Sequence, residues 1–446
     1  MSFRVDKQTI DDLAIFGKMR DNSVYGIFNK VHTHGGSKIL EKMFLQPLDK
    51  KEEINERQET IGAFQKNEIV FPYKSEFFDS AEFYLSNKDR RTRIVAHGNT
   101  LERKFKSVIG TDFNYKQIQK GIAAIIEIIC ITHNFLNHIE KSGIDKYCCK
   151  YTQAIGEILS MKELKEIPKI KNPKKLSFKE IANLDQTFRF SISESLNKLL
   201  VLIYTLDVYI SAAKVANDNK YCAAIALDPN PNYIKITDLY HPLLDNPISN
   251  SIEINDKNNM VFLTGANMAG KSTFMKSFGI AVYLAHVGFP VPATQMSFSV
   301  QNGLFTTINL PDNLNMGYSH FYAEVMRVKK VAQSISRSNK LIVIFDELFR
   351  GTNVKDAFDA TVAVTQAFAA NKECIFIIST HIIEAGEVLK EGCDNINFIY
   401  LPTIMKNNLP EYTYKIKSGI TEDRHGMIII NNEGIPDILK NRISKI

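Results

Sequence analysis

The segment whose residue types and spacing are most specific to one chemistry is a glycine-bounded loop. Residues Gly265–Ser272 read GANMAGKS and match the pattern GxxxxGK[S/T]. Such a loop wraps its backbone N–H groups around phosphate oxygens, while its lysine reaches the β- and γ-phosphates and its serine binds Mg²⁺. A chance match has a probability on the order of one per cent at average composition, so a plain glycine-rich turn is disfavoured. The sequence therefore predicts ATP and Mg²⁺ as ligands, with Lys271 on the phosphates and Ser272 on the metal ion.

Two acidic residues, Asp346 and Glu347, follow the apolar run Leu341–Phe345. A carboxylate at the carboxyl end of a strand can hold the Mg²⁺ shell beside Ser272, so Asp346 is predicted as a metal ligand. Glu347 is predicted to orient and deprotonate the attacking water. Two acids at a strand end can instead cap a helix, and the phosphate-loop pattern favours the catalytic interpretation.

A histidine ends a third apolar run. Cys374–Ile378 is followed by Ser379, Thr380 and His381. His381 is predicted to hydrogen-bond the γ-phosphate or the lytic water. A lone histidine is more often structural, so this prediction depends on the other two motifs.

The elements that must position these groups are short buried strands followed by helices. Met260–Leu263, Leu341–Phe345 and Cys374–Ile378 each read as a buried strand, and helical segments follow the first two. The first of these helices is expected over Thr273–Val287. This order is typical of an α/β domain with a mostly parallel sheet.

The first half of the chain has helical periodicity instead. Apolar residues recur at spacings of three, four and seven in two sets: Ile118, Ile122, Ile125, Ile126, Ile129 and Leu136, then Leu196, Leu199, Leu200, Ile203, Leu206 and Ile210. Ser191 and Ser193 are plausible N-caps for the second set. We place the boundary at about residue 222, which gives a mainly helical domain over 1–222 and an α/β domain over 223–446. Between the two sets, Lys162–Lys179 is rich in lysine and is expected to be a solvated loop or, alternatively, a phosphate-contacting surface.

Bulk composition excludes some classes of protein. The 446 residues carry a net charge of +6, which permits contact with nucleic acid without demanding it. No apolar run approaches the roughly 20 residues that span a bilayer, and Ile122–Ile131, interrupted by Glu127, reads as a buried helix. The N-terminus has no signal-peptide pattern, and the six cysteines show no metal-binding spacing. We therefore expect a cytoplasmic protein with no membrane partner.

The motifs taken together resemble those of the MutS family of DNA mismatch repair ATPases. Thr264–Lys276 reads TGANMAGKSTFMK, similar to the family's TGPNMGGKSTYMR. Further segments resemble GxxVPA, SxFxxE, DExxRGT and ATH: they are Gly288–Ala293, Ser319–Glu324, Asp346–Thr352 and Ser379–His381. The first half resembles the MutS core domain in four segments: Asn22–Phe28, His34–Leu40, Gln46–Leu48 and Glu56–Gln58.

The resemblance implies an ABC-type P-loop ATPase domain, preceded by a mainly α-helical core and lever domain. It implies a dimer, either a homodimer or a heterodimer with another MutS-like chain. Each ATP would lie between the phosphate loop of one subunit and the segment around Ser319 of the other, so that ATP favours the closed dimer. Carried over by motif, the nucleotide-binding residues are Gly265, Asn267, Met268, Ala269, Gly270, Lys271, Ser272, Thr273, Ser319, Arg350 and Tyr414.

The sequence also departs from the family pattern. Ala266 and Ala269 replace a proline and a glycine, and Phe349 replaces a glycine at the expected dimer junction. The core motif begins at Asn22, so the mismatch-reading and connector domains of full-length relatives are expected to be absent. A full DNA clamp is not expected to fit inside the helical half, nor a helix-turn-helix after Pro436.

The function predicted from these residues is a DNA-binding ATPase acting in mismatch repair or a related process. Backbone contacts to DNA are expected from Lys88, Arg90, Arg91 and Arg93, or from the stretch 162–179. Base-level mismatch recognition is not expected, because no wedge aromatic is available. The alternative is an ATP-driven protein-interaction switch that does not touch DNA, and a P-loop kinase is disfavoured.

Overall fold

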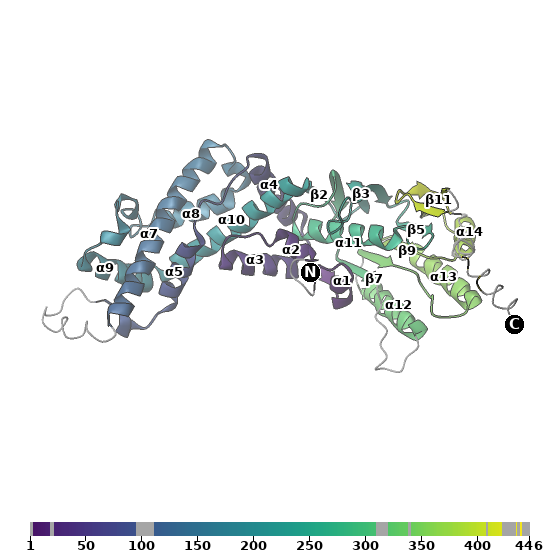
Figure 1. Cartoon of the computed structure of the whole chain (residues 1–446), viewed down its shortest axis with the longest axis horizontal. Coiled ribbons are helices and arrows are strands. Elements are labelled where there is room, and N and C mark those ends of the chain that lie inside the picture. Colours follow the sequence, from purple (N-terminus) through teal and green to yellow (C-terminus); the bar gives the residue numbers. More distant parts are fainter. Residues whose placement is uncertain are drawn as a thin grey trace. The chain divides into compact units, whose positions relative to one another are not determined.

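The computed structural model describes residues 3–17, 22–94, 111–308, 320–337, 340–406 and 409–421, together with 434 and 438. The chain forms two compact units (Figure 1). Unit 1 consists of Met1–Ile27, Phe44–Gln58 and Ala216–Ile446, and unit 2 consists of Phe28–Met43 and Glu59–Val215. This division differs from the single boundary expected near residue 222, because two segments of the first 58 residues pack with the C-terminal half.

A seven-stranded sheet organises unit 1. Its strand order is β1-β7-β8-β9-β5-β10-β13, and every neighbouring pair is parallel except β10 with β13. The strands are β1 (Arg4–Val5), β5 (Met260–Gly265), β7 (Gly303–Thr307), β8 (Leu341–Phe345), β9 (Ile375–Ser379), β10 (Ile396–Leu401) and β13 (Lys417–Ser418). The three strands expected from apolar runs are confirmed, the third displaced by one residue. Their carboxyl ends meet at one edge, since parallel β5 and β8 both flank β9.

Helices follow these strands in unit 1. They are α1 (Lys7–Asp12), α2 (Val24–Phe28), α11 (Lys271–Val287), α12 (His320–Arg337), α13 (Val354–Ala369) and α14 (Ile383–Gly392). Helix α11 is buried along nearly its whole length, as an apolar central helix must be. It begins two residues before the expected Thr273 and ends at Val287, where Gly288 takes a left-handed φ of 77°.

Smaller sheets complete unit 1. Four strands pair in the order β2-β6-β3-β4, and β11 pairs with β12 in a separate hairpin. Their bounds are β2 (Ala224–Leu227), β3 (Tyr233–Leu239), β4 (Asn250–Asn255), β6 (Gln295–Ser299), β11 (Thr403–Lys406) and β12 (Leu409–Tyr412). The segment between β3 and β4 contributes to the site described below.

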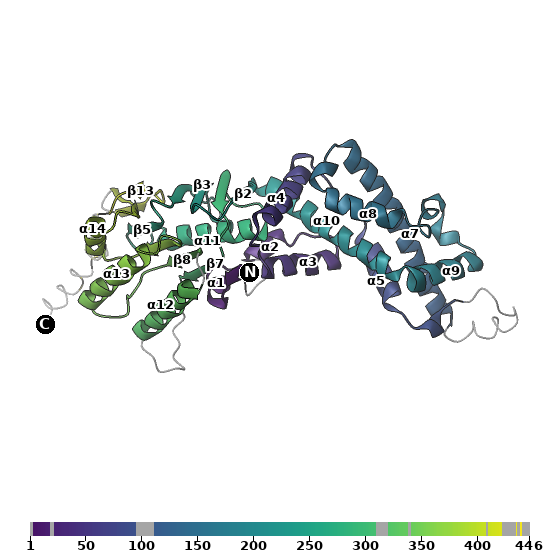
Figure 2. The same ribbon diagram turned by 180° about the vertical axis from the view of Figure 1, so that it is seen from behind.

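Unit 2 is helical, as the periodicity predicts (Figure 2). Its helices are α3 (His34–Leu45), α4 (Lys51–Lys66), α5 (Ser75–Ser86), α7 (Thr111–Lys141), α8 (Cys149–Leu159), α9 (Phe178–Asp185) and α10 (Ser193–Asn219), and the unit boundaries fall inside α2, α3, α4 and α10. A π-helical turn, Gln186–Ser191, and 3₁₀ turns at Arg90–Thr92, Asp145–Tyr147, Ile167–Lys169 and Pro173–Lys175 complete it. The lysine-rich stretch consists mainly of turns with exposed lysines, as expected for a solvated loop, and its last two residues begin α9.

Two helices pass a length and composition test for crossing a membrane. They are Tyr115–Lys141 of α7 and Ser193–Asn219 of α10, among the residues that the structure describes. In α10, 78% of the apolar window is buried inside the protein, and in α7 half of it is. The run Ile122–Ile131 lies in α7 with most of its isoleucines buried, so the expected buried helix is confirmed.

Candidate functional site

The glycine-bounded loop joins β5 to α11 in unit 1. Gly265 and Gly270 take left-handed φ values of 147° and 102°. A Cβ on Gly265 would lie 3.1 Å from the carbonyl oxygen of Leu401, and one on Gly270 would lie 3.1 Å from the ring of Tyr414. Glycine is therefore required at both positions for backbone freedom and for close approach. The loop opens directly into the N-terminus of α11, where backbone N–H groups are free to bind an anion.

Lys271 lies across this loop. Its side chain is largely buried, and its Nζ donates to the carbonyl oxygens of Gly265 at 2.9 Å and Ala266 at 3.2 Å. Burial lowers the pKa of Lys271, while the nearby charges of Glu347 and Asp346 oppose that shift. The ammonium is thus bonded to carbonyl oxygens, which a phosphate oxygen can replace with a stronger, charge-assisted bond.

Ser272 and Asp346 are in direct contact. Ser272 Oγ donates to Asp346 Oδ2, and Ser379 Oγ donates to Asp346 Oδ1 at 2.5 Å. Burial raises the pKa of Asp346, and these two hydrogen bonds oppose the rise. The hydroxyl and the carboxylate that the sequence predicts as metal ligands are therefore close enough to share one cation.

The donor set fits Mg²⁺ rather than a metal held wholly by protein. Among the described residues, no group of three or more His, Cys, Asp or Glu side chains gathers to hold a metal ion. Mg²⁺ is commonly bound by one or two protein oxygens, with water and phosphate oxygens as its other ligands. Ser272 and Asp346 supply that kind of partial shell.

Glu347 is bonded through both carboxylate oxygens. The ring N–H at Nε2 of His381 donates to Oε1 at 2.5 Å, and Arg350 Nη1 donates to Oε2 at 3.0 Å. The hydrogen bond from His381 is the main reason that the pKa of Glu347 falls to about 2. Glu347 also has a left-handed φ of 55°, which is uncommon outside glycine. The structure thus places Glu347, the predicted base, in contact with both His381 and Arg350, for which the sequence predicted contacts to the nucleotide or the lytic water.

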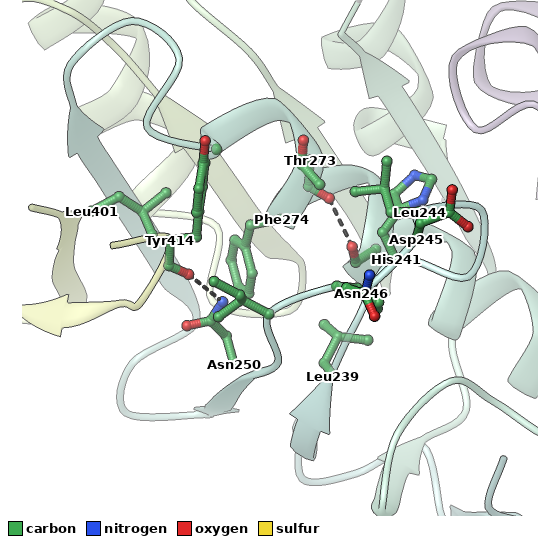
Figure 3. Close-up of a pocket in the computed structure, with 14 residues that line it drawn as sticks. Leu239, His241, Leu244, Asp245, Asn246, Asn250, Thr273, Phe274, Leu401 and Tyr414 are labelled. Carbon is green, nitrogen blue, oxygen red and sulfur yellow. Dashed lines mark hydrogen bonds between the residues drawn. The ribbon is translucent and has the colours of Figure 1, made fainter. Parts of the chain in front are cut away.

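A cavity of about 300 Å³ lies beside the loop (Figure 3). Tyr414 and Gly270 line it, and Asn250 Nδ2 donates to the Tyr414 carbonyl at 2.9 Å. Burial lowers the pKa of His241, also in the lining, to about 4. The remaining lining is largely apolar and comes from Leu239, Leu244, Ile248, Phe274 and Leu401, among others. The sequence singled out Tyr414 here, and it missed the lining residues of the 239–250 segment because no motif marks them.

The other residues that the sequence assigned to the nucleotide site or the dimer junction differ in exposure and in the part of the site they reach. Asn267 and Met268 are exposed at the loop, Ala269 is buried, and Thr273 lines the cavity. Ser319 lies outside the described residues, so its expected position across a dimer interface stays a prediction. Phe349, where the family pattern has glycine, takes a left-handed φ of 62°, and its ring packs against Phe321 at 6.0 Å.

Comparison with protein families finds two matches that together cover most of the chain. Residues 8–213 match the model of MutS domain III, and residues 261–446 match that of MutS domain V. Proteins named DNA mismatch repair protein MutS are similar to it. The one from Thermosipho melanesiensis is 23% identical over 99% of this chain and 64% of its own length. The one from Fusobacterium nucleatum is 30% identical over 57% of this chain and 28% of its own length. The one from Leuconostoc mesenteroides is 23% identical over 98% of this chain, which covers 62% of that relative.

Proposed function

This chain belongs to the MutS family, and from that premise we propose that it is an ATP-hydrolysing, DNA-binding protein of mismatch repair or related DNA processing. The chain spans less than two thirds of the length of the relatives that cover it almost completely. The observation that carries the ATPase proposal is the contact between Ser272 and Asp346 at the end of the phosphate loop. A cytoplasmic location is part of the same proposal.

In this proposal the triphosphate lies in the loop at the N-terminus of α11. Lys271 exchanges its bonds to the Gly265 and Ala266 carbonyls for bonds to phosphate oxygens. Ser272 and Asp346 would hold Mg²⁺, whose charge offsets that of the phosphates when bound. The base and ribose fit the cavity lined by Tyr414, since its largely apolar walls with a few polar groups are typical of small-ligand sites.

Glu347 is proposed as the base that accepts a proton from the attacking water. Its bonds to His381 and Arg350 keep its pKa low, and a carboxylate of low pKa is a weak base. A γ-phosphate offers both donors, the His381 ring and the Arg350 guanidinium, another anionic partner. We therefore propose that ATP draws His381 and Arg350 toward the phosphate and so frees Glu347 for the water.

Dimerisation completes the proposed site. The segment around Ser319 of a second subunit, in a homodimer or a heterodimer, would contact the γ-phosphate of the first. ATP then stabilises the closed dimer through contacts that exist only in that state.

The DNA part of the proposal rests on two basic segments of unit 2. In the loop 87–94, Lys88, Arg90 and Arg93 are exposed, while Arg91 is paired with Asp89 at 2.7 Å. Arg189, a buried residue of the turn Gln186–Ser191, holds the loop by donating to Thr92 Oγ1 at 2.9 Å.

The second basic segment is KNPKKLSFK, residues 171–179, which contains four lysines and no acid. Its lysines are exposed, and Gln119 of α7 donates to the Lys174 carbonyl at 3.3 Å. Exposed lysines on a segment whose backbone is bonded to α7 suit sequence-independent contacts to a phosphate backbone.

The test measures ATP turnover and DNA binding with matched, mismatched and branched duplexes over a salt series. We expect Mg²⁺-dependent phosphate release, and DNA binding that weakens steeply as salt rises. Negligible binding to every duplex at low salt would refute the DNA part. Turnover that no DNA alters, with a protein partner retained only by the Glu347→Gln variant in ATP, would favour the protein-interaction switch instead.

A further inference from the structure

Ser379, the last residue of β9, carries a hydroxyl that bonds both the side chain of Asp346 and the backbone of Glu347. The residue is fully buried and pairs across the sheet with Leu263 of β5. Its Oγ donates to Oδ1 of Asp346 at 2.5 Å and accepts the backbone N–H of Glu347 at 3.1 Å. A serine hydroxyl has one hydrogen and two lone pairs, so it can make both bonds at once.

The bond to Asp346 fixes the direction of that carboxylate. Ser379 binds Oδ1, and Ser272 of the phosphate loop binds Oδ2. Hydrogen bonds to an ionised carboxylate are roughly twice as strong as neutral ones, and rotating the carboxylate would break both. Ser379 therefore keeps Oδ2 turned toward the end of the loop, where Mg²⁺ is proposed to bind.

The bond to Glu347 supports a strained turn. Glu347 has a φ of 55°, in the left-handed region that non-glycine residues rarely adopt. The backbone N–H of Glu347 donates to the Ser379 carbonyl oxygen and to the Ser379 hydroxyl, each at 3.1 Å. The hydroxyl thus adds a second anchor to the backbone that carries the proposed base.

We propose that Ser379 is a positioning residue of the Mg²⁺–ATP site, which sets the rotation of the Asp346 carboxylate and holds the backbone of Glu347. This inference rests on the proposed ATPase function. The usual family text at this place is ATH, and alanine has no hydroxyl. The ATH pattern quoted above therefore does not supply this hydroxyl, which comes from Ser379 of this chain.

The test compares Ser379→Ala with a matched control, Ser299→Ala, in the full chain. Ser299 is also fully buried, and its Oγ accepts the backbone N–H of Tyr233 at 2.9 Å, away from the acids. The readout is the half-saturating free Mg²⁺ concentration for binding of a fluorescent, non-hydrolysable ATP analogue. We expect Ser379→Ala to raise it about tenfold or more, the effect of losing a hydrogen bond to a charged group. Ser299→Ala should leave it unchanged.

Three further measurements separate positioning from general destabilisation. Binding of the analogue in excess EDTA should be equal in the wild type and both variants, because Ser379 is not placed on the phosphates. Ser379→Thr keeps the hydroxyl and should restore most of the Mg²⁺ affinity. With Mg²⁺ saturating, kcat of Ser379→Ala should fall while KM for ATP changes little.

The outcomes distinguish this inference from the proposed function. If the wild type shows no Mg²⁺-dependent binding of the analogue, the ATPase proposal fails and this inference fails with it. If the wild type binds and folded Ser379→Ala has the same Mg²⁺ dependence, only the role of Ser379 is overturned. If Ser379→Ala does not fold, Ser379→Cys is tested instead, because a thiol has a similar size but is a weaker hydrogen-bond donor. A Ser379→Cys protein with the Mg²⁺ dependence of the wild type would contradict the proposal.

Discussion

At the residue scale, Lys271 and Glu347 already have hydrogen-bond partners that must be exchanged or released when a triphosphate binds. Lys271 is bonded to loop carbonyls, and Glu347 is bonded to His381 and Arg350. These bonds keep buried charges satisfied, which avoids the cost of an unpaired ion. If ATP binding replaced these bonds with contacts to phosphate, it would also free the Glu347 carboxylate to accept a proton from water.

Replacing Glu347 by glutamine tests the base directly. Glu347→Gln keeps the side chain's size but removes the proton acceptor, so ATP binding should persist while turnover falls about 10²- to 10⁴-fold. Phosphate release and equilibrium nucleotide binding, measured on the same preparation, check this. The control is Glu387→Gln, an exposed residue of α14, which should behave as wild type. Wild-type turnover in Glu347→Gln would assign the base to another group.

At the element scale, the first residues of the chain are part of the sheet that carries the site. Strand β1 pairs in parallel with β7, and Asp6 caps α1 by accepting the N–H of Thr9. Asp6 also bonds Arg327 of α12, whose Nη2 donates to the carbonyl of Thr306 at 2.6 Å. This mostly buried ion pair ties α12, the helix after the Ser319 segment, to the sheet edge.

Asp6→Asn tests that tie and its pH dependence. Burial would raise the pKa of Asp6, but its bonds to Arg327 outweigh burial and hold the pKa well below its ordinary 3.8. Its stabilising contribution is therefore present above pH 3.8 and lost as pH falls further below that value. We expect Asp6→Asn to lower the stability by about 3 kcal/mol at pH 7. Asparagine can still cap α1 through its amide oxygen, but it loses the charge and one of the two oxygens that accept hydrogen bonds from Arg327.

Calorimetric melting temperatures of wild type and Asp6→Asn, compared at pH 7 and at pH 3 or below, check this prediction. The difference between the two proteins should shrink at the acidic pH. A difference that is the same at every pH would show that the charge of Asp6 contributes nothing and that the variant acts by shape alone.

Phe349 combines backbone strain with packing in the turn after β8. Its φ of 62° is a conformation that glycine adopts freely, yet its buried ring packs against Phe321 of α12. Strain of this kind costs about 1–3 kcal/mol, whereas truncating a buried phenylalanine costs about 3–5 kcal/mol. Packing therefore outweighs strain.

Phe349→Gly should accordingly lower the melting temperature, by an amount that corresponds to roughly 2 kcal/mol. Phe349→Ala should have a lower melting temperature than Phe349→Gly, because alanine loses the ring and still has the strained positive φ. Thermal unfolding of the three proteins measures the order. A Phe349→Gly protein more stable than wild type would mean that relief of strain dominates.

At the scale of the whole molecule, the chain combines two units with different proposed tasks. Unit 1 carries the candidate nucleotide site, and unit 2 carries the exposed basic segments. A DNA contact in this chain would rest on charge, so its signature is the salt dependence of binding.

The loop 87–94 offers a matched test of that signature. Arg90→Ala and Arg93→Ala should each reduce the slope of log affinity against log salt by up to about 0.9, if each cation contacts one phosphate. Arg91→Ala should change it less, because the Arg91 guanidinium is bonded to both carboxylate oxygens of Asp89. Fluorescence anisotropy with one duplex at several salt concentrations measures the slopes. If all three variants had the same slope as the wild type, the loop 87–94 would not contact DNA phosphates.

Local pattern was sufficient to predict much of this protein. The three buried strands follow from continuous apolar runs bounded by the motifs, and the helical unit follows from hydrophobic periodicity. The contact of Ser272 with Asp346 was also predictable, because the carboxyl ends of parallel strands meet at one edge of a sheet.

Other features depend on residues far apart in sequence, and only the tertiary structure decided them. Strand β1 joins a sheet some 300 residues later in the chain, and the segment between β3 and β4 walls the cavity beside Tyr414. The hydroxyl of Ser379 contacts the Asp346 carboxylate and the Glu347 backbone at the end of the neighbouring strand β8, and Phe349 occupies a turn that the family pattern gives to glycine. Such contacts are hydrogen bonds and packing between distant segments, and no local period or motif encodes them.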